Sequence, residues 1–158
     1  MVESVTDNLG RQRQLLSNIL KQIRTMRRMT ARAVSAAMDM PLRSYYSFES
    51  GQGALDLTKL WRFADATDSD PFAIVIALVV GSPDYALRSM DNKAASILLA
   101  SLKHFNDRVG DRMVHVGSAA FIEAFKRQFD SLEEHLAKRD QSTERWLAEN
   151  LLKIVPPE

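Results

Sequence analysis

The chain of 158 residues contains no cysteine. This absence excludes disulfide bonds, thiolate metal sites and cysteine nucleophiles, and it is consistent with a reducing compartment such as the cytoplasm. The three histidines, His104, His115 and His135, lie too far apart in the sequence to share a helix-spaced metal motif. The sequence therefore predicts neither a metal site nor a cofactor.

Long hydrophobic runs are also missing. The longest one, residues 72–80, lies between Pro71 and Gly81, and it is about half of the roughly 18 residues that a membrane-spanning helix needs. The start of the chain carries Glu3 and Asp7 and no apolar stretch follows it, which is unlike a secretory signal peptide. We therefore expect a cytoplasmic protein without a membrane partner.

Acidic residues are almost absent from residues 11–43, where Asp39 is the only one. This stretch has eight basic residues and a net charge of +7, whereas the whole chain has a formal net charge of +1. Clustered Lys and Arg are typical of a surface that binds a polyanion such as a nucleic acid. A solvated helix face is the alternative, and charge alone does not separate the two. The basic residues are Arg11, Arg13, Lys21, Arg24, Arg27, Arg28, Arg32 and Arg43.

The spacing of apolar residues is helical throughout, and the sequence predicts an all-α protein. Leu16, Ile19, Leu20 and Ile23 recur at steps of three and four, which predicts an amphipathic helix over residues 8–29. Further capping signals predict four more helices within residues 8–80. They are Thr30 before a helix over residues 31–38, Pro41 and Gly51 at the two ends of a helix over residues 41–50, Asp56 before a fourth helix, and Asp70-Pro71 before a fifth helix over residues 72–80.

The C-terminal half, residues 81–155, is expected to be a separate helical region that begins at Gly81-Ser82-Pro83. Its predicted elements are a helix from residue 83 that restarts near Asp91, an irregular segment over residues 110–117, and a long helix with a break near Asp140. Aromatic and aliphatic residues stripe the long helix, and such stripes usually pack against another helix. We expect that this other helix belongs to a second copy of the chain, in a homodimer. The stripe comprises Phe121, Phe125, Phe129, Leu132, Leu136 and Trp146, and Ile154 continues it.

Residues 30–51 contain the most informative pattern, because they predict two short helices joined by a tight turn. Val34 and Met38 fall on the inner face of the first helix, and Tyr45 and Phe48 on the inner face of the second. The major groove of B-DNA is about 12 Å wide and admits one α-helix. The second helix would then present its outer residues to the groove, namely Leu42, Arg43, Ser44, Tyr46 and Ser47.

Residues 16–78 resemble the helix-turn-helix domain of the lambda repressor and Cro superfamily, also called the XRE family. The resemblance rests on Thr30 at the start of the second helix, the inner Val34 and Met38, Met40 in the turn, Phe48-Glu49-Ser50-Gly51 at the end of the third helix, and the apolar pattern of Leu57, Leu60 and Phe63-Ala64.

The resemblance implies that the third helix reads base edges and that Leu42, Arg43 and Tyr46 make base contacts. It also implies phosphate contacts from Arg28, Arg32, Ser50 and Gln52, and from the backbone amides near Thr30 and Ala31. Three positions depart from the family pattern. Ala31 stands where a DNA-contacting glutamine is common, Asp39 where the turn usually has glycine, and Pro41-Leu42 where small polar residues are usual.

The sequence thus predicts a sequence-specific DNA-binding transcription regulator, with repression favoured by the resemblance. The expected regulator binds a near-palindromic operator on double-stranded DNA as a homodimer in the cytoplasm, associated with the nucleoid. No catalytic residues are predicted, because the cluster of Asp130, Glu133, Glu134 and His135 is best interpreted as a charged helix face. A self-cleaving serine-lysine domain is not expected either, because that domain is rich in β-strand.

Two alternatives remain open at this point. In the first, the helix-turn-helix is a scaffold and the C-terminal helices bind another protein, such as RNA polymerase, a toxin or another regulatory protein. In the second, the C-terminal helices enclose a small apolar effector.

Overall fold

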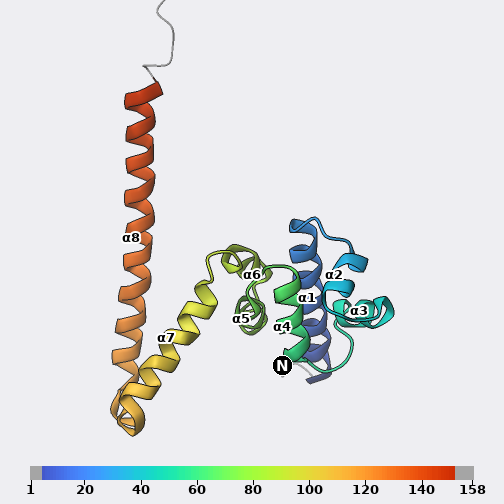
Figure 1. The fold of residues 1–158 in the computed structure, drawn as a ribbon. Coiled ribbons are helices and arrows are strands. Elements are labelled where there is room, and N and C mark those ends of the chain that lie inside the picture. The colour runs from blue at the N-terminus through green and yellow to red at the C-terminus, as the bar shows by residue number, and fades with distance from the viewer. Residues whose placement is uncertain (1–4, 152–158) are drawn as a thin grey trace, which may run out of the picture. The chain divides into compact units, whose positions relative to one another are not determined.

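The computed structural model describes residues 5–151, so Ile154 and residues 152–155 of the predicted C-terminal region lie outside the described residues. Between residues 5 and 151 the chain forms eight α-helices and one 3-10 helix and contains no strand (Figure 1). The all-α prediction is therefore confirmed. The elements are α1 (Val5–Met26), α2 (Ala31–Ala37), α3 (Leu42–Glu49), α4 (Leu57–Ala66), α5 (Pro71–Val80), α6 (Pro83–Ser89), α7 (Ala94–Val109), η1 (Gly110–His115) and α8 (Ser118–Leu151).

The contacts divide the chain into two compact units, Met1–Phe105 and Asn106–Glu158. The first unit extends past residue 80, where the sequence predicts a boundary. Gly81 adopts a left-handed conformation with φ of 69° and ends α5, so the chain reverses and α6 packs on α5 and α1. Ala86 and Met90 are consequently buried in the same core as the first five helices.

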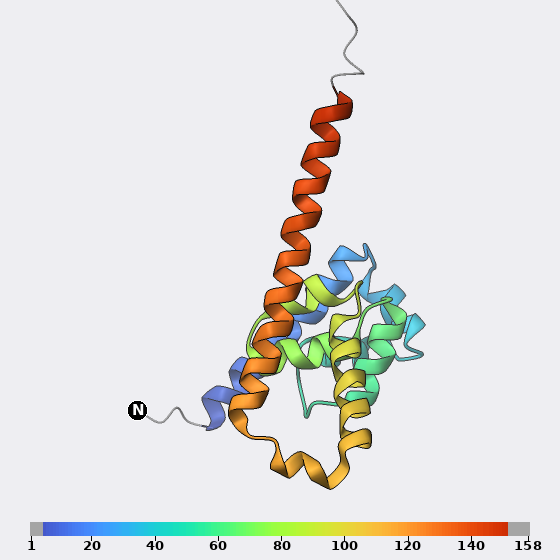
Figure 2. The ribbon, with the colours of Figure 1, turned by 90° about the vertical axis from the view of Figure 1, so that its left-hand side faces the viewer.

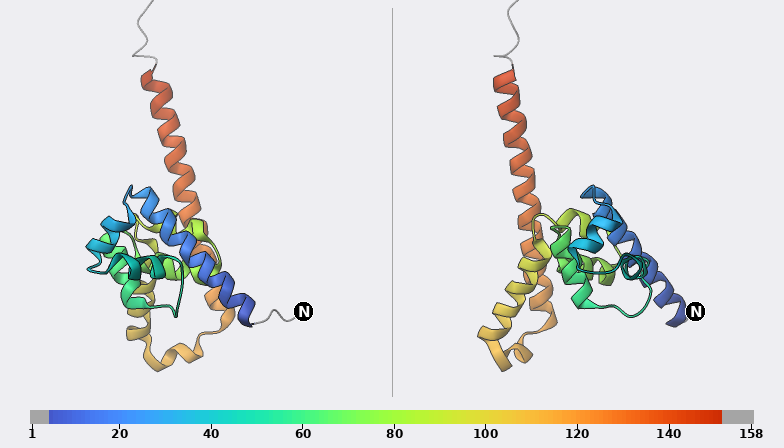
Figure 3. Two further views of the ribbon diagram at one scale, coloured as in Figure 1. Left: turned by 90° about the vertical axis from the view of Figure 1, so that its right-hand side faces the viewer. Right: turned by 45° about the vertical axis from the view of Figure 1, so that its right-hand side comes forward.

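The core of the first unit forms around α1, which packs against α3, α5 and α6 (Figure 3). Leu16, Ile19, Leu20 and Ile23 of α1 are all buried, as the spacing of three and four residues predicts. The other elements contribute apolar side chains that point at this stripe. The buried ones include Val34, Met38, Tyr45, Phe48, Leu60, Phe63, Ile74 and Ala77.

Three predicted N-caps are confirmed. The side chain of Thr30 accepts a hydrogen bond from the amide of Ala33, that of Asp56 from Lys59, and that of Asp70 from Phe72, at 3.1, 3.2 and 3.0 Å. Each of these bonds satisfies a donor that has no partner within its own helix. Ser82 precedes α6 as predicted, but its side chain makes no capping hydrogen bond.

Asp70 also holds α7 to the core of the first unit. Its carboxylate is fully buried and accepts hydrogen bonds from the amide and hydroxyl of Ser96, at 3.1 and 2.7 Å. The ammonium of Lys93 donates to the carbonyl of Ser69 at 3.2 Å. The start of α7 is therefore fixed to the start of α5 through polar contacts between residues that are far apart in the sequence.

Several predicted boundaries are wrong. α1 ends at Met26 and not at residue 29, because Arg28 takes a left-handed conformation with φ of 54°. Pro41 is the N-cap residue of α3 and lies just outside its first turn. The helix predicted to restart near Asp91 begins at Ala94.

The second unit contains the other two corrections. Much of the segment expected to be irregular forms the 3-10 helix η1. α8 continues without a break through Asp140 (Figure 2). Its sequence contains neither glycine nor proline between Ser118 and Leu151, so nothing in it interrupts the backbone hydrogen bonds of a helix.

Candidate nucleic-acid interface

The turn between α2 and α3 sets the geometry of the interface. Asp39 has a φ of 51°, the left-handed conformation that glycine, asparagine and aspartate tolerate best. Aspartate therefore fills the position at which the family usually has glycine. The amides of Met38 and Met40 close the turn by donating to the carbonyls of Val34 and Ser35, at 2.9 and 3.0 Å.

The inner face of α3 is fixed by aromatic packing. Tyr45 is fully buried and Phe48 is 8% exposed, as predicted. Phe48 lies against both Tyr45 and Phe63 in tilted arrangements, with ring centroids 6.2 and 6.0 Å apart. Such pairs add to the stabilisation that burial alone provides, so α3 is held in one rotation about its axis.

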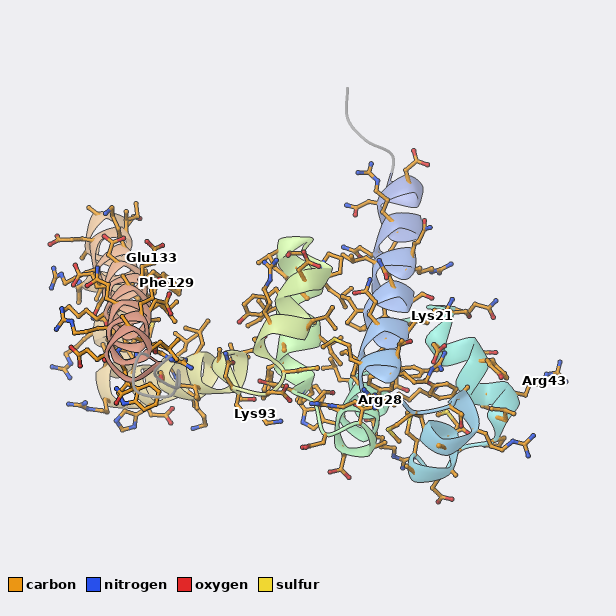
Figure 4. The ribbon with its side chains drawn as sticks, turned by 90° about the horizontal axis from the view of Figure 1, so that it is seen from above. Lys21, Arg28, Arg43, Lys93, Phe129 and Glu133 are labelled. Atoms are coloured by element: carbon orange, nitrogen blue, oxygen red, sulfur yellow. The ribbon has the colours of Figure 1, made fainter. Side chains whose placement is uncertain are left out.

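The same rotation exposes the opposite face. Arg43, Ser44, Tyr46 and Ser47 are exposed, and Arg43 projects outward from α3 (Figure 4). Leu42 is only partly exposed because it packs against the core, so it offers less surface to a base than the sequence suggests.

Six of the predicted DNA-contacting residues line one shallow depression on this face. The hydroxyls of Ser47 and Ser50 donate to the carbonyls of Arg43 and Ser47, at 3.4 and 2.9 Å. The lining residues are Leu42, Arg43, Tyr46, Ser47, Ser50 and Gln52.

The start of α2 offers backbone amides, and not side chains, for the predicted phosphate contact. The hydroxyl of Thr30 caps the amide of Ala33. The side chain of Ala31 is buried, at 8% exposure, so only its backbone is left to meet a phosphate. Arg28 and Arg32 are exposed on either side of this helix start.

Glu49 positions α3, a role that its place in the family-like tetrapeptide Phe48-Glu49-Ser50-Gly51 did not predict. Its carboxylate is buried and accepts two hydrogen bonds from Arg24, from Nε at 2.8 Å and from Nη2 at 2.9 Å. The hydroxyl of Tyr45 donates to the same carboxylate. A bidentate pair of this kind fixes orientation as well as distance, and here it joins the end of α3 to α1.

Hydrogen bonding and burial shift the pKa values of two groups in this cluster. The pKa of the Arg24 guanidinium is raised, mainly by its hydrogen bond to Glu49. Burial raises the pKa of the Tyr45 hydroxyl, and the hydrogen bond that it donates to Glu49 raises it further. The sequence does carry a signal for this cluster, because Tyr45 and Glu49 are four residues apart on one helix face.

Arg24 and Arg27 make contacts that stabilise the fold and do not present their charge at the interface. Arg27 donates to the carbonyls of Thr67 and Asp68 at 2.8 and 2.6 Å, and it pairs with the carboxylate of Asp91. Because Glu49 and Asp91 neutralise two of the arginines in residues 11–43, the exposed positive charge is smaller than the +7 of that stretch implies.

The residues predicted to form the dimer interface all lie on α8, in the second unit. Phe121 stacks on Phe125, with ring centroids 5.8 Å apart. Five of these residues are more than half exposed in the single chain, namely Phe125, Phe129, Leu132, Leu136 and Trp146. Exposed large apolar side chains on one helix are typical of an interaction surface.

An apolar pocket of about 530 Å³ lies in the first unit, whereas the effector hypothesis places the ligand among the C-terminal helices. The N-terminal half of α1, the loop between α3 and α4, and α5 form its walls. Its lining includes Leu9, Leu16, Leu55, Val75, Leu78 and Val79.

Comparison with known proteins identifies the region that contains this interface. Residues 20–74 match a family model described as helix-turn-helix. This segment is a helix-turn-helix domain of the lambda repressor/Cro-like (XRE) type, and its presence supports a role in DNA binding and transcription regulation. Neither the curated proteins nor the solved structures contain a match. Across the part of the chain that the structure describes, no helix combines the length and hydropathy needed to cross a bilayer.

Proposed function

We propose that the chain represses transcription by binding a near-palindromic operator as a homodimer. In this proposal residues 8–80 bind DNA and residues 81–155 hold the two copies together, with α6 supporting the first region through its packing. The supporting observation is the depression on the outer face of α3, where six candidate contact residues converge. A regulator of this kind acts on the chromosome, so a cytoplasmic, nucleoid-associated location follows from the proposal.

Arg43 is the residue to which we assign sequence reading. It is exposed on the side of α3 opposite Tyr45 and Phe48, and its guanidinium can bond O6 and N7 of a guanine together. A bidentate contact of this kind contributes roughly 1–3 kcal/mol of discrimination between bases. Tyr46, 54% exposed, and Ser44 and Ser47 lie on the same side of the helix and would contact neighbouring bases or phosphates.

Phosphate contacts would set the position of α3 in the groove. Arg28 and Arg32 flank the start of α2, and Ser50 and Gln52 lie at the far end of α3. The backbone at Thr30 and Ala31 would add one more contact at a helix start. Contacts of this kind carry no sequence information but make binding strongly dependent on salt.

The homodimer has a physical reason beyond the exposed residues of α8. One helix-turn-helix domain buries too little surface for tight specific binding, whereas two copies related by a two-fold axis double the contact surface. Their α3 helices would meet successive major grooves about 34 Å apart and therefore read a near-palindrome.

The experiment that tests this proposal is selection of bound fragments from random duplex DNA, with the molar mass of the complex measured by sedimentation. We expect a near-palindromic motif and two chains per site. Binding that occurs only at low salt, with no motif, would instead mean that the basic surface is a general polyanion site.

A second candidate function is a protein-interaction module in which the helix-turn-helix serves as a scaffold. Ala31 stands where the family commonly has a DNA-contacting glutamine, and Leu42 is partly buried against the core. Both observations favour this candidate, because they leave fewer side chains to contact DNA. In that case the exposed residues of α8 would bind RNA polymerase, a toxin or another regulator. A chain that sediments as a monomer and selects no DNA motif would support this candidate.

A further inference from the structure

The apolar residues of α8 follow a heptad pattern over fifteen residues of the helix, from Ile122 to Leu136. They alternate in steps of three and four, which keeps them on one face of a helix that winds around a neighbour. All five are more than half exposed in the single chain, from 53% for Phe125 to 68% for Ile122. We call this set the α8 seam: Ile122, Phe125, Phe129, Leu132 and Leu136.

The faces beside and behind the α8 seam are charged. Arg127 pairs with Glu123 at 2.7 Å, and Lys126 pairs with Asp130 at 2.6 Å, both along the helix. The Arg127–Glu123 pair lies on the side opposite the seam, where such pairs remain in solvent. Lys126 lies at the edge of the seam and is held there by Asp130 of its own helix. Figure 4 shows Phe129 of the seam and Glu133 at its edge, both on α8. A partner is therefore required on one side of α8 only.

We propose that the α8 seam pairs with the α8 seam of a second copy in an antiparallel orientation. The register sets Phe129 opposite Leu132 of the partner subunit and Phe125 opposite Leu136 of the partner subunit. This inference rests on the proposed homodimer and adds its orientation and register. All four of these residues then meet apolar side chains, and each contact occurs twice because of the two-fold axis.

Charge at the edge of the seam distinguishes this orientation from the others. Lys126 directly follows Phe125 of the seam, and Glu133 directly follows Leu132, so the two occupy the same heptad position. In an antiparallel pair, residues at this position on the two helices face each other. Lys126 then lies opposite Glu133 of the partner subunit, and the symmetry repeats the attraction. Lys126 is 72% exposed although it pairs with Asp130, and Glu133 is also exposed, so the ammonium can contact the partner's carboxylate in addition to that of Asp130.

Other antiparallel registers bring like charges together. A shift by one heptad in one direction places Lys126 opposite its own copy. A shift in the other direction places Glu133 opposite its own copy and sets Phe125 opposite Thr143. The first shift replaces an attraction with a repulsion. The second adds the repulsion between the two Glu133 copies while it sets Lys126 opposite Asp140 of the partner subunit, and it is unfavourable mainly because it removes apolar pairs from the seam.

A parallel arrangement is less favourable for a different reason. Arg139 continues the heptad pattern after Leu136, so in a parallel pair it meets its own copy inside the seam. In the antiparallel register it lies opposite Ile122 of the partner subunit, at the end of the apolar run, where its guanidinium reaches solvent. A parallel pair would offer only His135 and Asp140 as opposite charges, and they attract only while the imidazole is protonated.

The absence of native cysteine allows a direct test with the full-length chain. The Ile122→Cys and Arg139→Cys variants are mixed, left to exchange subunits, and treated with a short bis-maleimide. The antiparallel register predicts a cross-link between Cys of one variant and Cys of the other. Thr143→Cys alone serves as the second measurement. In the antiparallel register its copy lies about 37 Å away along the axis, at 1.5 Å per residue, so no cross-link forms. In a parallel pair Thr143→Cys would cross-link to its own copy and the two mixed variants would not cross-link. That outcome would overturn the inference.

Charge reversal tests the register independently. Lys126→Glu and Glu133→Lys should each weaken self-association roughly tenfold in sedimentation, and the double variant should restore it. Lys138→Glu, on the outer face of α8, is the matched control and should leave association unchanged. Single reversals without effect in a chain that still dimerises would reject this register while leaving the proposed homodimer intact. A chain that is monomeric in every variant, the unaltered chain included, would reject both.

Discussion

The carboxylate of Glu49 and the guanidinium of Arg24 form a bidentate ion pair, at 2.8 and 2.9 Å, between the end of α3 and the body of α1. The side chain of Glu49 is 4% exposed and that of Arg24 is 22% exposed. A pair so far removed from water is costly to break, because the remaining partner keeps its desolvation penalty. The presentation of α3 to DNA therefore depends on a contact that does not touch DNA.

Replacing Glu49 with Gln should lower the free energy of unfolding by about 2–3 kcal/mol, because Arg24 loses its counter-charge in a half-buried place. Urea unfolding monitored by circular dichroism measures the change. Asp84→Asn is the matched control, since the ion pair of Asp84 with Arg88 in α6 is exposed and 3.5 Å long. That control should change stability by less than about 0.5 kcal/mol. Equal effects of the two substitutions would contradict the structural role of Glu49.

Tyr45 should make the stability of the first unit depend on alkaline pH. Burial raises the pKa of its hydroxyl in the folded state, so above about pH 10, the ordinary tyrosine value, the folded chain retains a proton that the unfolded chain releases. Stability that is complete below that pH must then fall as the pH rises. The free energy of unfolding should be measured from about pH 8 to about pH 11, a range that brackets the ordinary tyrosine pKa. It should fall more steeply with rising pH in the unaltered chain than in Tyr45→Phe. Identical pH profiles would show that Tyr45 does not cause the decline.

Gly51 should be the glycine least tolerant of substitution. A Cβ at this position would lie 2.3 Å from the carbonyl oxygen of Arg13, and the residue has a φ of 74°. Gly51→Ala should therefore cost about 3 kcal/mol or more, because the loop after α3 must move away from α1. Gly53→Ala separates the cost of the steric clash from the cost of the positive φ, since Gly53 also has a positive φ but has open space around it. It should cost only about 1 kcal/mol.

Asp70 should contribute more to stability than an ordinary helix cap. Asp70→Ala removes the cap of α5 and both hydrogen bonds to Ser96, so we expect a loss of about 3 kcal/mol. Asp56→Ala, at a cap whose side chain is 43% exposed, should cost about 1 kcal/mol. Hydrogen exchange at the amide of Ser96 supplies a second measurement, because it should become faster only in the Asp70 variant. Unchanged exchange there would mean that Asp70 does not hold α7.

Local chemistry explains which parts of the fold are predictable from the sequence. Thr30, Asp56 and Asp70 act on amides two or three residues away, so a short window of sequence contains both partners. The burial of α1 likewise follows from the spacing of its own apolar residues. The left-handed conformation of Asp39 likewise agrees with its place in the turn, because few residue types other than glycine tolerate that conformation.

The features that the sequence did not reveal depend on partners far apart in the chain. Arg24 meets Glu49 across 25 positions, Arg27 meets Asp91 across 64, and Asp70 meets Ser96 across 26. Gly81-Ser82-Pro83 resembles a linker in composition, yet it forms a tight reversal that returns α6 to the core. Within the candidate interface, the exposed residues of α3 were predictable from periodicity, whereas the burial of Ala31 and the packing of Leu42 required the neighbouring helices.

The measurement that tests the central claim most directly is a comparison of bound sequences for the unaltered chain, Arg43→Ala and Arg88→Ala, at low and high salt. Arg88 is an exposed arginine of α6, 78% exposed, and it controls for the loss of one positive charge. We predict that Arg43→Ala relaxes one base position in each half-site and that the preference lost there is worth roughly 1–3 kcal/mol. Arg88→Ala should leave the motif unchanged. The same motif at full strength from Arg43→Ala, at both salt concentrations, would contradict base reading by Arg43 in α3.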